Sequence, residues 1–150
     1  AEIKFRTCSM INDVYIGIGG NLVPDGYSGL HAAFEDAITQ LSKSLDIVAV
    51  SPWYISAPVP VSDQPDFLNA VAHIRTGLSA HSLLEILHVV EKRFGRVRTA
   101  RNAARKLDLD ILAHGSAVID DDELTVPHPR LSERAFVLLP WFDLVHPLNR

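Results

Sequence analysis

The stretch FLNAVAHIRTGLSAHSLLEILHVVEKRFG, residues 67–95, contains a strand pattern followed directly by a helix pattern. Apolar and polar residues alternate through FLNAVAHIRT until Gly77, which is typical of a β-strand. From Ser79 the apolar residues recur with the helical period, and Ser79 and Gly95 suit the two helix caps. The stretch therefore predicts a strand over 67–76 and a helix over 79–95.

The same alternation of strand and helix precedes this stretch. DVYIGIGGN, residues 13–21, reads as a strand that ends in a tight glycine turn, and apolar residues then follow the helical period from Leu30 to Leu45. DIVAVSPWYI, residues 46–55, is rich in β-branched and aromatic residues and predicts a second strand. The proline-rich segment 56–66 that follows it predicts a long loop.

The pattern ends in a fourth strand and a hairpin. KLDLDILA, residues 106–113, predicts the strand, and residues 116–129 predict a short hairpin with an acidic turn. The apolar segment 136–144 fits no single assignment. The order strand, helix, strand, strand, helix, strand predicts an α+β, ferredoxin-like βαββαβ fold: an antiparallel sheet with both helices on one face, plus the C-terminal hairpin.

Length, charge and cysteine content limit the class of protein. The chain has 150 residues, a formal net charge of -4 and one cysteine, Cys8. We expect residues 1–12 to be an N-terminal extension or expression remnant, and residues 13–150 to form a single domain. The net charge argues against nucleic-acid or membrane binding through the overall field, and no apolar run has the length of a transmembrane helix. We expect a cytoplasmic protein, since one cysteine fits a reducing compartment. We also expect it to be a monomer.

Half of the 14 basic residues lie in one acid-free segment between residues 92 and 106. Guanidinium groups suit bidentate contact with phosphate oxygens, so this segment predicts an anion site. The alternative is a solvated basic turn that pairs weakly with the acidic run at 120–123. The basic residues are Lys92, Arg93, Arg96, Arg98, Arg101, Arg105 and Lys106.

Two aspartates lie in the strand that follows this basic segment. Side chains at positions i and i+2 of a strand share a face, so Asp108 and Asp110 form a carboxylate pair while Leu107 and Leu109 face the core. Carboxylates about 7 Å apart repel each other unless a cation lies between them, and Mg²⁺ prefers such oxygen ligands. The alternative is an exposed strand face with two solvated aspartates. Carboxylates for a metal beside arginines for phosphate favour a polyphosphate substrate.

Other nucleotide and metal motifs are absent from the sequence. GIGGNL lacks the last glycine of G-x-G-x-x-G, and there is no G-x-x-x-x-G-K-[ST] and no H-E-x-x-H. His88 and Glu91 are expected on one helix face, opposite Leu87 and Phe94, where they could reach a nucleotide. His128 lies between two prolines that fix the backbone, which suits either a positioned contact or a plain loop.

Six motifs occur along the chain in a characteristic order. They are IGIGGNL (16–22), SPWYISAPV (51–59), DQPDFLNAV (63–71), EKRFGRVR (91–98), ARKLDLDIL (104–112) and LTVPHPRLSERAFVLLP (124–140). Together they closely resemble the 6-hydroxymethyl-7,8-dihydropterin pyrophosphokinase family of folate biosynthesis, and the resemblance covers roughly residues 13–144.

The resemblance implies a ferredoxin-like enzyme that transfers pyrophosphate from ATP to the hydroxymethyl group of the dihydropterin and leaves AMP. It implies two Mg²⁺ ions on Asp108 and Asp110, with Arg96 and Arg105 contacting phosphates during catalysis and Arg101 nearby. The implied ATP contacts are His88, Glu91, Arg98, Ile111, Thr125, His128 and Arg134. The implied pterin contacts are Ser56, Ala57, Val59, Phe67, Asn69 and Phe136.

The sequence departs from the family pattern at several positions. Asn102 stands where the family often has tryptophan, in a loop one residue shorter than usual. His88 replaces the more usual glutamine, Gly20 the more usual serine, and Glu123 a residue that is basic in some members.

Two other functions compete with this reading. A ferredoxin-like RNA-binding module would use the sheet face, but the chain has no RNP1-type aromatic string and its net charge is negative. A metal-dependent phosphohydrolase would use the same carboxylates with water as the acceptor. The phosphohydrolase gives no role to the DQPDFLN motif.

Overall fold

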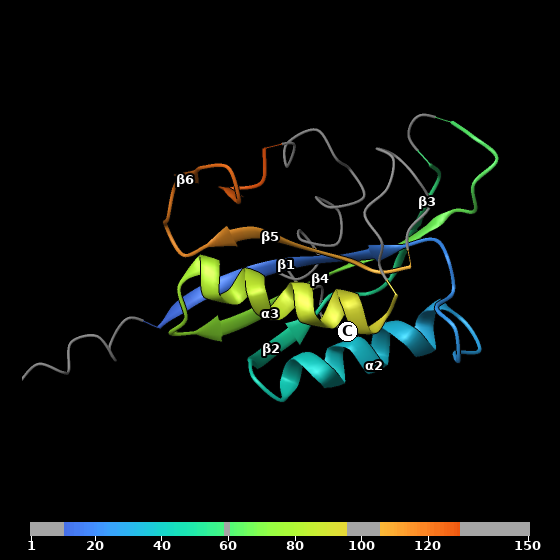
Figure 1. The fold of residues 1–150 in the computed structure, drawn as a ribbon, viewed down its shortest axis with the longest axis horizontal. Helices are drawn as coiled ribbons and strands as arrows, with labels where there is room; N and C mark the ends of the chain where they lie inside the picture. The colour runs from blue at the N-terminus through green and yellow to red at the C-terminus, as the bar shows by residue number, and fades with distance from the viewer. Residues whose placement is uncertain (1–10, 59–60, 96–105, 130–150) are drawn as a thin grey trace, which may run out of the picture.

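The structure is a computed structural model that describes residues 11–58, 61–95 and 106–129. Its element order confirms the predicted βαββαβ arrangement, with the hairpin after it (Figure 1). The elements are β1 (Asn12–Gly20), α2 (Leu30–Ser42), β2 (Asp46–Val50), β3 (Tyr54–Ser56), β4 (Phe67–Thr76), α3 (Ala80–Arg93), β5 (Asp108–His114), β6 (Ile119–Asp120) and β7 (Thr125–Val126).

The main sheet has the strand order β2-β4-β1-β5, and β3 also pairs with β4. Each of these pairings is antiparallel, and β6 and β7 form a separate antiparallel pair. The two long strands β1 and β4 lie side by side along their whole length, from Asn12 opposite Thr76 to Gly20 opposite Leu68. This order is the one expected of a ferredoxin-like fold.

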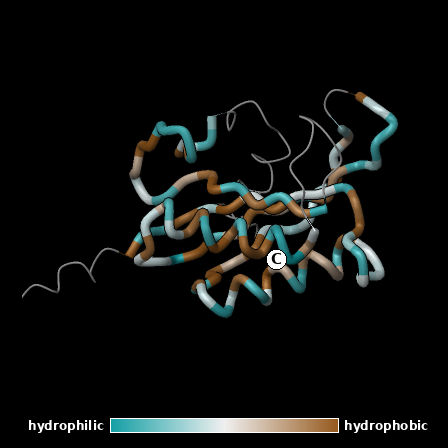
Figure 2. The backbone as a smooth tube through the Cα atoms, in the orientation of Figure 1, coloured by the Kyte–Doolittle hydropathy of each residue, from teal (hydrophilic) through white to brown (hydrophobic). Residues whose placement is uncertain are grey.

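One face of the sheet packs against both helices. Val14, Ile16 and Ile18 alternate along β1, are at most 2% exposed and belong to the same core cluster as Phe34 of α2 and Leu83 of α3. Because both helices contribute to a cluster built on one set of alternating strand residues, they cover the same face (Figure 1). Figure 2 shows the hydrophobic residues concentrated along the central strands, with hydrophilic residues in the β6–β7 turn.

The helix ends follow the predicted caps closely. The Ser79 side chain accepts a hydrogen bond from the Ser82 backbone N–H, which confirms the predicted N-cap. Gly95, predicted as the C-cap, is one residue beyond the actual cap and has φ of 79°, the left-handed conformation that favours glycine there. Helix α2 ends at Ser42 rather than at Leu45, although Leu45 remains buried in the core.

The single strand predicted over 46–55 was wrong, because the structure divides it into β2 and β3. Pro52 has no backbone N–H to donate to a ladder. At the break, the Ser51 backbone N–H donates to the Val71 carbonyl oxygen at 2.8 Å, and Ser51 Oγ accepts from the Val71 N–H at 2.9 Å. Ser51 thus satisfies the backbone N–H and carbonyl groups of Val71 in β4, at the gap between β2 and β3.

Neither described helix has both the length and the apolar composition needed to cross a membrane.

Candidate active site

The two aspartates of β5 lie on the sheet face opposite the helices. Leu109 and Ile111 are at most 3% exposed and belong to the core, whereas Asp108 and Asp110 are partly exposed. The predicted division of this strand into an apolar and an acidic face is therefore confirmed.

The β1 neighbours of both aspartates are glycines. Asp108 pairs with Gly19, and Asp110 pairs with Gly17. Because glycine carries no side chain, β1 places nothing beside either carboxylate on this face. The space over these glycines is taken by neighbouring side chains instead: a β-carbon at Gly17 would lie 3.3 Å from Leu112 Cδ2.

The next strand brings a residue of the expected pterin site into the same row. Asn69 of β4 pairs with Gly19 on the other side of β1. Paired strands lie about 4.8 Å apart, so the Cα atoms of Asn69 and Asp108 lie roughly 10 Å apart with only Gly19 between them. A β-carbon added at Gly19 would lie 2.9 Å from Asn69 Oδ1, so the glycine also makes room for this amide.

The amide of Asn69 is held by a neighbouring strand. Asn69 is 7% exposed, and its Nδ2 donates to Ser56 Oγ at 2.8 Å. Ser56 pairs with Phe67, so these three residues lie on one face of the β3–β4 pair. Ala57 follows directly and is exposed. Three residues expected at the pterin site, Ser56, Phe67 and Asn69, are therefore brought together from two strands.

Glu91 has a different environment from the one predicted. It is 3% exposed and, like Leu87 and Phe94, it is buried, so its placement opposite these residues was wrong. Its Oε2 accepts a hydrogen bond of 2.7 Å from the Leu109 backbone N–H. Leu109 lies in β5, an edge strand of the sheet, and an N–H at that edge needs an acceptor from outside the sheet. Glu91 therefore ties α3 to the strand that carries both aspartates.

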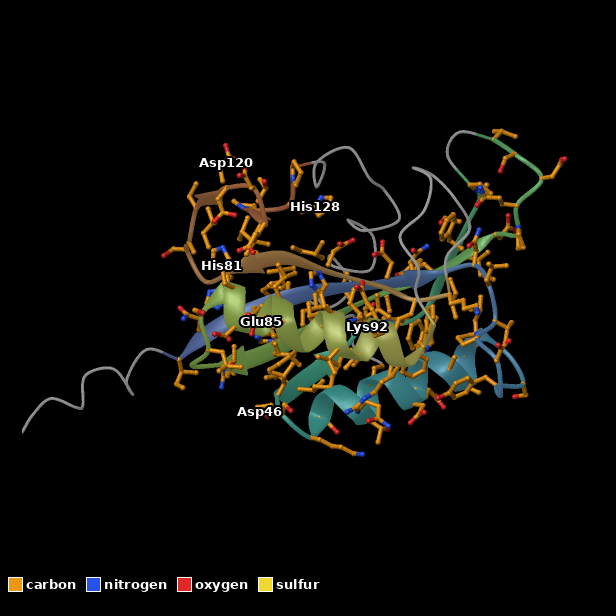
Figure 3. The ribbon with its side chains drawn as sticks, viewed as in Figure 1. Asp46, His81, Glu85, Lys92, Asp120 and His128 are labelled. Atoms are coloured by element: carbon orange, nitrogen blue, oxygen red, sulfur yellow. The ribbon has the colours of Figure 1, made fainter. Side chains whose placement is uncertain are left out.

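Four residues expected to contact ATP lie on three different segments. His88 is exposed on α3, and Thr125 is partly exposed on β7. The His128 backbone N–H donates to the Leu112 carbonyl oxygen at 3.0 Å, which holds His128 beside β5 (Figure 3). Ile111 has its side chain in the core, so only its backbone can face a ligand.

The β6–β7 hairpin that carries Thr125 is linked to the start of α3 (Figure 3). His81 Nε2 lies 2.9 Å from Asp121 Oδ2, while Asp121 Oδ1 accepts from the backbone N–H groups of Glu123 and Leu124. These backbone N–H groups, followed by His81, lower the pKa of the Asp121 carboxyl below its ordinary value. The ionised carboxylate thus stabilises both the turn and its contact with the helix.

Several expected site residues lie outside the described residues, and so does most of the basic segment. Among the residues that are described, no group of three or more histidine, cysteine, aspartate or glutamate side chains could hold a metal ion. The residues outside are Val59, Arg96, Arg98, Arg101, Arg105, Arg134 and Phe136.

Three features of the site were missed from the sequence. Gly17 and Gly19 alternate with isoleucines just as the two aspartates alternate with leucines, and this shared period of two could have revealed the glycine positions. The burial of Glu91 could have been read from its spacing of four residues from Leu87. Asn21 contacts a segment more than 40 residues away, and no local pattern signals that contact.

Comparison with known proteins agrees with this arrangement. Residues 15–146 match the family model described as 7,8-dihydro-6-hydroxymethylpterin-pyrophosphokinase. The Haemophilus influenzae protein named 2-amino-4-hydroxy-6-hydroxymethyldihydropteridine pyrophosphokinase is 44% identical to this chain, over 89% of this chain and 82% of its own length. The Pseudomonas aeruginosa protein of the same name is also 44% identical, over 93% of this chain and 85% of its own length. The protein of that name from Bacillus subtilis is 36% identical over 94% of this chain and 83% of its own length. With the sheet order and the row of site residues described above, these matches show that the chain belongs to the 7,8-dihydro-6-hydroxymethylpterin-pyrophosphokinase family.

Proposed function

We propose that this chain transfers the pyrophosphoryl group of ATP to the hydroxymethyl group of 6-hydroxymethyl-7,8-dihydropterin, in folate biosynthesis. The hydroxymethyl oxygen attacks the β-phosphorus of ATP and loses its proton. The bond between that phosphorus and the oxygen bridging to the α-phosphorus breaks, so AMP leaves and the dihydropterin pyrophosphate forms. Family membership supports the reaction, and the row of Asn69, Gly19 and Asp108 supports its location.

That row is the observation that carries the proposal. An amide that can donate and accept hydrogen bonds suits the edge of a pterin ring, and a carboxylate suits a metal-bound phosphate. A separation of roughly 10 Å lets a pterin held at Asn69 extend its hydroxymethyl group across Gly19 toward phosphates held near Asp108. Holding the two reactants in line contributes to rate because it removes the entropic cost of their encounter.

Asp108 and Asp110 are proposed to hold two Mg²⁺ ions together with ATP. Two carboxylates on one strand face, with no side chain from β1 beside them, fit a cation that takes its remaining ligands from phosphate oxygens and water. Bound there, Mg²⁺ supplies positive charge that offsets the charge on the transferring phosphates. We assign Arg96 and Arg105 to the same phosphates, and His88, Arg98, Ile111, Thr125, His128 and Arg134 to ATP, whereas Glu91 is occupied by its hydrogen bond to the Leu109 N–H.

The pterin is proposed to bind against the β3–β4 pair. Asn69 orients the ring edge, Ser56 orients the Asn69 amide, and the Phe67 ring offers an apolar face for a flat bicyclic ligand. Ala57, Val59 and Phe136 complete the proposed pterin contacts.

The reaction is tested by incubating the protein with ATP, Mg²⁺ and the hydroxymethyl dihydropterin and separating the nucleotide products. We expect AMP in equal amount to the dihydropterin pyrophosphate. Sustained release of ADP, or ATP turnover without any pterin, would instead indicate a kinase of another type or a phosphohydrolase.

Asp110→Ala tests the carboxylate role separately. Asp110 is partly exposed and its side chain points away from the core, so the variant should fold normally and lose turnover by about 10²-fold or more. Circular dichroism and thermal unfolding provide the folding control. Unchanged turnover in a folded Asp110→Ala protein would remove the metal role from this residue.

A further inference from the structure

Asn21 joins the end of β1 to a loop that is distant in sequence. Its side chain is 3% exposed, and Nδ2 donates to Gln64 Oε1 at 3.1 Å and to the Pro65 carbonyl oxygen at 3.0 Å. The two acceptors lie 43 and 44 residues further along the chain. A buried amide that donates to two neighbouring residues fixes both the position and the direction of that segment.

The loop concerned connects the two halves of the proposed pterin site. It leaves β3 after Ser56 and enters β4 at Phe67, and Pro65 lies two residues before Phe67. The β1–β4 backbone ladder ends where Gly20 pairs with Leu68. The hydrogen bonds of Asn21 therefore continue the attachment of β1 to this segment beyond the last backbone pair.

Burial gives this loop little other support. Of residues 61–66 only Gln64 is partly buried, and Val61 is 91% exposed. Ser62 Oγ accepts from the Gln64 N–H at 3.2 Å, a contact within the loop that does not attach it to the sheet. The position of the loop relative to β1 thus depends strongly on Asn21, because an exposed segment gains little from hydrophobic contact.

We propose that Asn21 is a positioning residue for the dihydropterin: it acts through Gln64 and Pro65 to hold the loop that places Phe67 and Ser56 around the ring. The inference rests on the proposed function and adds to it a residue outside the ligand contacts. ATP is expected to bind on the β5 side of the site, so its binding should not depend on this clamp.

Asn21→Asp is the most direct test because it keeps the shape of the side chain and removes both donors. Gln64 can turn its amide to donate to the new carboxylate, but the Pro65 carbonyl cannot donate and loses its partner. We expect the KM for the dihydropterin to rise by up to about tenfold, as for the loss of one hydrogen bond. We expect the KM for ATP and kcat to change by less than about threefold, which is under 0.7 kcal/mol.

Two variants at Gln64 test the clamp from its other side. Gln64→Glu keeps an oxygen that accepts from Asn21, so its KM for the dihydropterin should stay close to that of the unmodified protein. Gln64→Ala removes one of the two acceptors without altering the buried Asn21, and the KM should rise severalfold. These variants keep the proposal testable even if Asn21→Asp folds poorly.

Ile74→Val is the matched control for a general loss of stability. Ile74 is fully buried near the far end of β4, opposite Val14, and the substitution destabilises by about 0.5–1.5 kcal/mol without touching the loop. Its KM for the dihydropterin should not change. Amide hydrogen exchange in residues 61–66 should accelerate in Asn21→Asp and not in Ile74→Val.

The outcomes separate this inference from the proposed function. A protein that releases AMP normally, but whose Asn21→Asp variant keeps the same KM for the dihydropterin, would overturn the positioning role alone. An equal rise in the KM for ATP, or the same rise in Ile74→Val, would also overturn it. Failure of the unmodified protein to bind the dihydropterin at all would overturn the proposed function, and this inference with it.

Discussion

Replacing Glu91 with alanine is expected to destabilise the protein by about 2–4 kcal/mol, whereas Glu91→Gln should change its stability by less than about 1 kcal/mol. The side chain is 3% exposed, and Oε2 accepts from the Leu109 N–H at 2.7 Å. Alanine leaves that buried N–H without its acceptor, and glutamine retains an oxygen that can take the same hydrogen bond.

The magnitude for alanine follows from two losses. An unsatisfied buried N–H costs about 1–3 kcal/mol, and removal of the one buried methylene group that alanine lacks costs about 0.8 kcal/mol. Glutamine loses the charge of the acceptor, but it also removes the cost of burying an ionised carboxylate, so the two effects largely offset each other.

Thermal and urea unfolding measure the difference. For a domain of this size 1 kcal/mol corresponds to about 2–4 °C, so Glu91→Ala should lower the Tm by roughly 10 °C. Its kcat should also fall, because Leu109 lies between the two aspartates and the helix no longer holds their strand. Glu91→Gln should retain most of the kcat.

Two results would contradict this reasoning. Equal stability of the alanine and glutamine variants would show that the hydrogen bond to Leu109 contributes little. A raised KM for ATP in Glu91→Gln at unchanged Tm would show that the carboxylate charge serves the nucleotide, which is the role first expected from the sequence.

Three further substitutions have definite expected outcomes. Gly19→Ala places a β-carbon 2.9 Å from Asn69 Oδ1, so the Kd for the dihydropterin, measured by titration calorimetry, should rise at least severalfold while the Kd for an ATP analogue stays constant. Gly20→Ser places a β-carbon 2.6 Å from the Lys106 carbonyl oxygen, so it should destabilise the protein by about 1–3 kcal/mol in urea unfolding. An unchanged unfolding midpoint would disprove this close approach. Asp121→Asn should lower the Tm at neutral pH but not in acid. The pKa of Asp121 is lowered in the folded protein, so its carboxylate stabilises the fold above the ordinary pKa of 3.8, and this stabilisation disappears as the pH falls through the folded value. A difference in Tm that stays constant down to pH 2 would argue against this role.

Local patterns predicted most of the fold. Alternation and helical period located the four strand regions and both helices, and Ser79 marked a helix start, because these signals depend on neighbours within a few residues. The break between β2 and β3 was not predicted. It depends on Ser51 replacing backbone contacts to Val71, a residue 20 positions away.

The candidate site was likewise predicted only in part from local patterns. The facing of Asp108 and Asp110 follows from the period of a strand and could be predicted. The environment of Glu91 and the contacts of Asn21 depend on which segments the fold brings together, so composition and period carry little information about them. The register of β1 against its two neighbours likewise became known only from the structure.

That register explains how a strongly alternating sheet can carry both a core and a reaction site. On β1 the isoleucines at 16 and 18 face the helices, and the glycines at 17 and 19 face the aspartates and Asn69. Because the side-chain period of a strand is two, a shift of β5 by one residue would bury both carboxylates and expose Leu109 and Ile111. The apolar core therefore enforces the register that places Asp108 beside Gly19. Substitutions on the glycine and aspartate face should consequently alter substrate binding and turnover more than stability, and substitutions of the isoleucines should do the reverse.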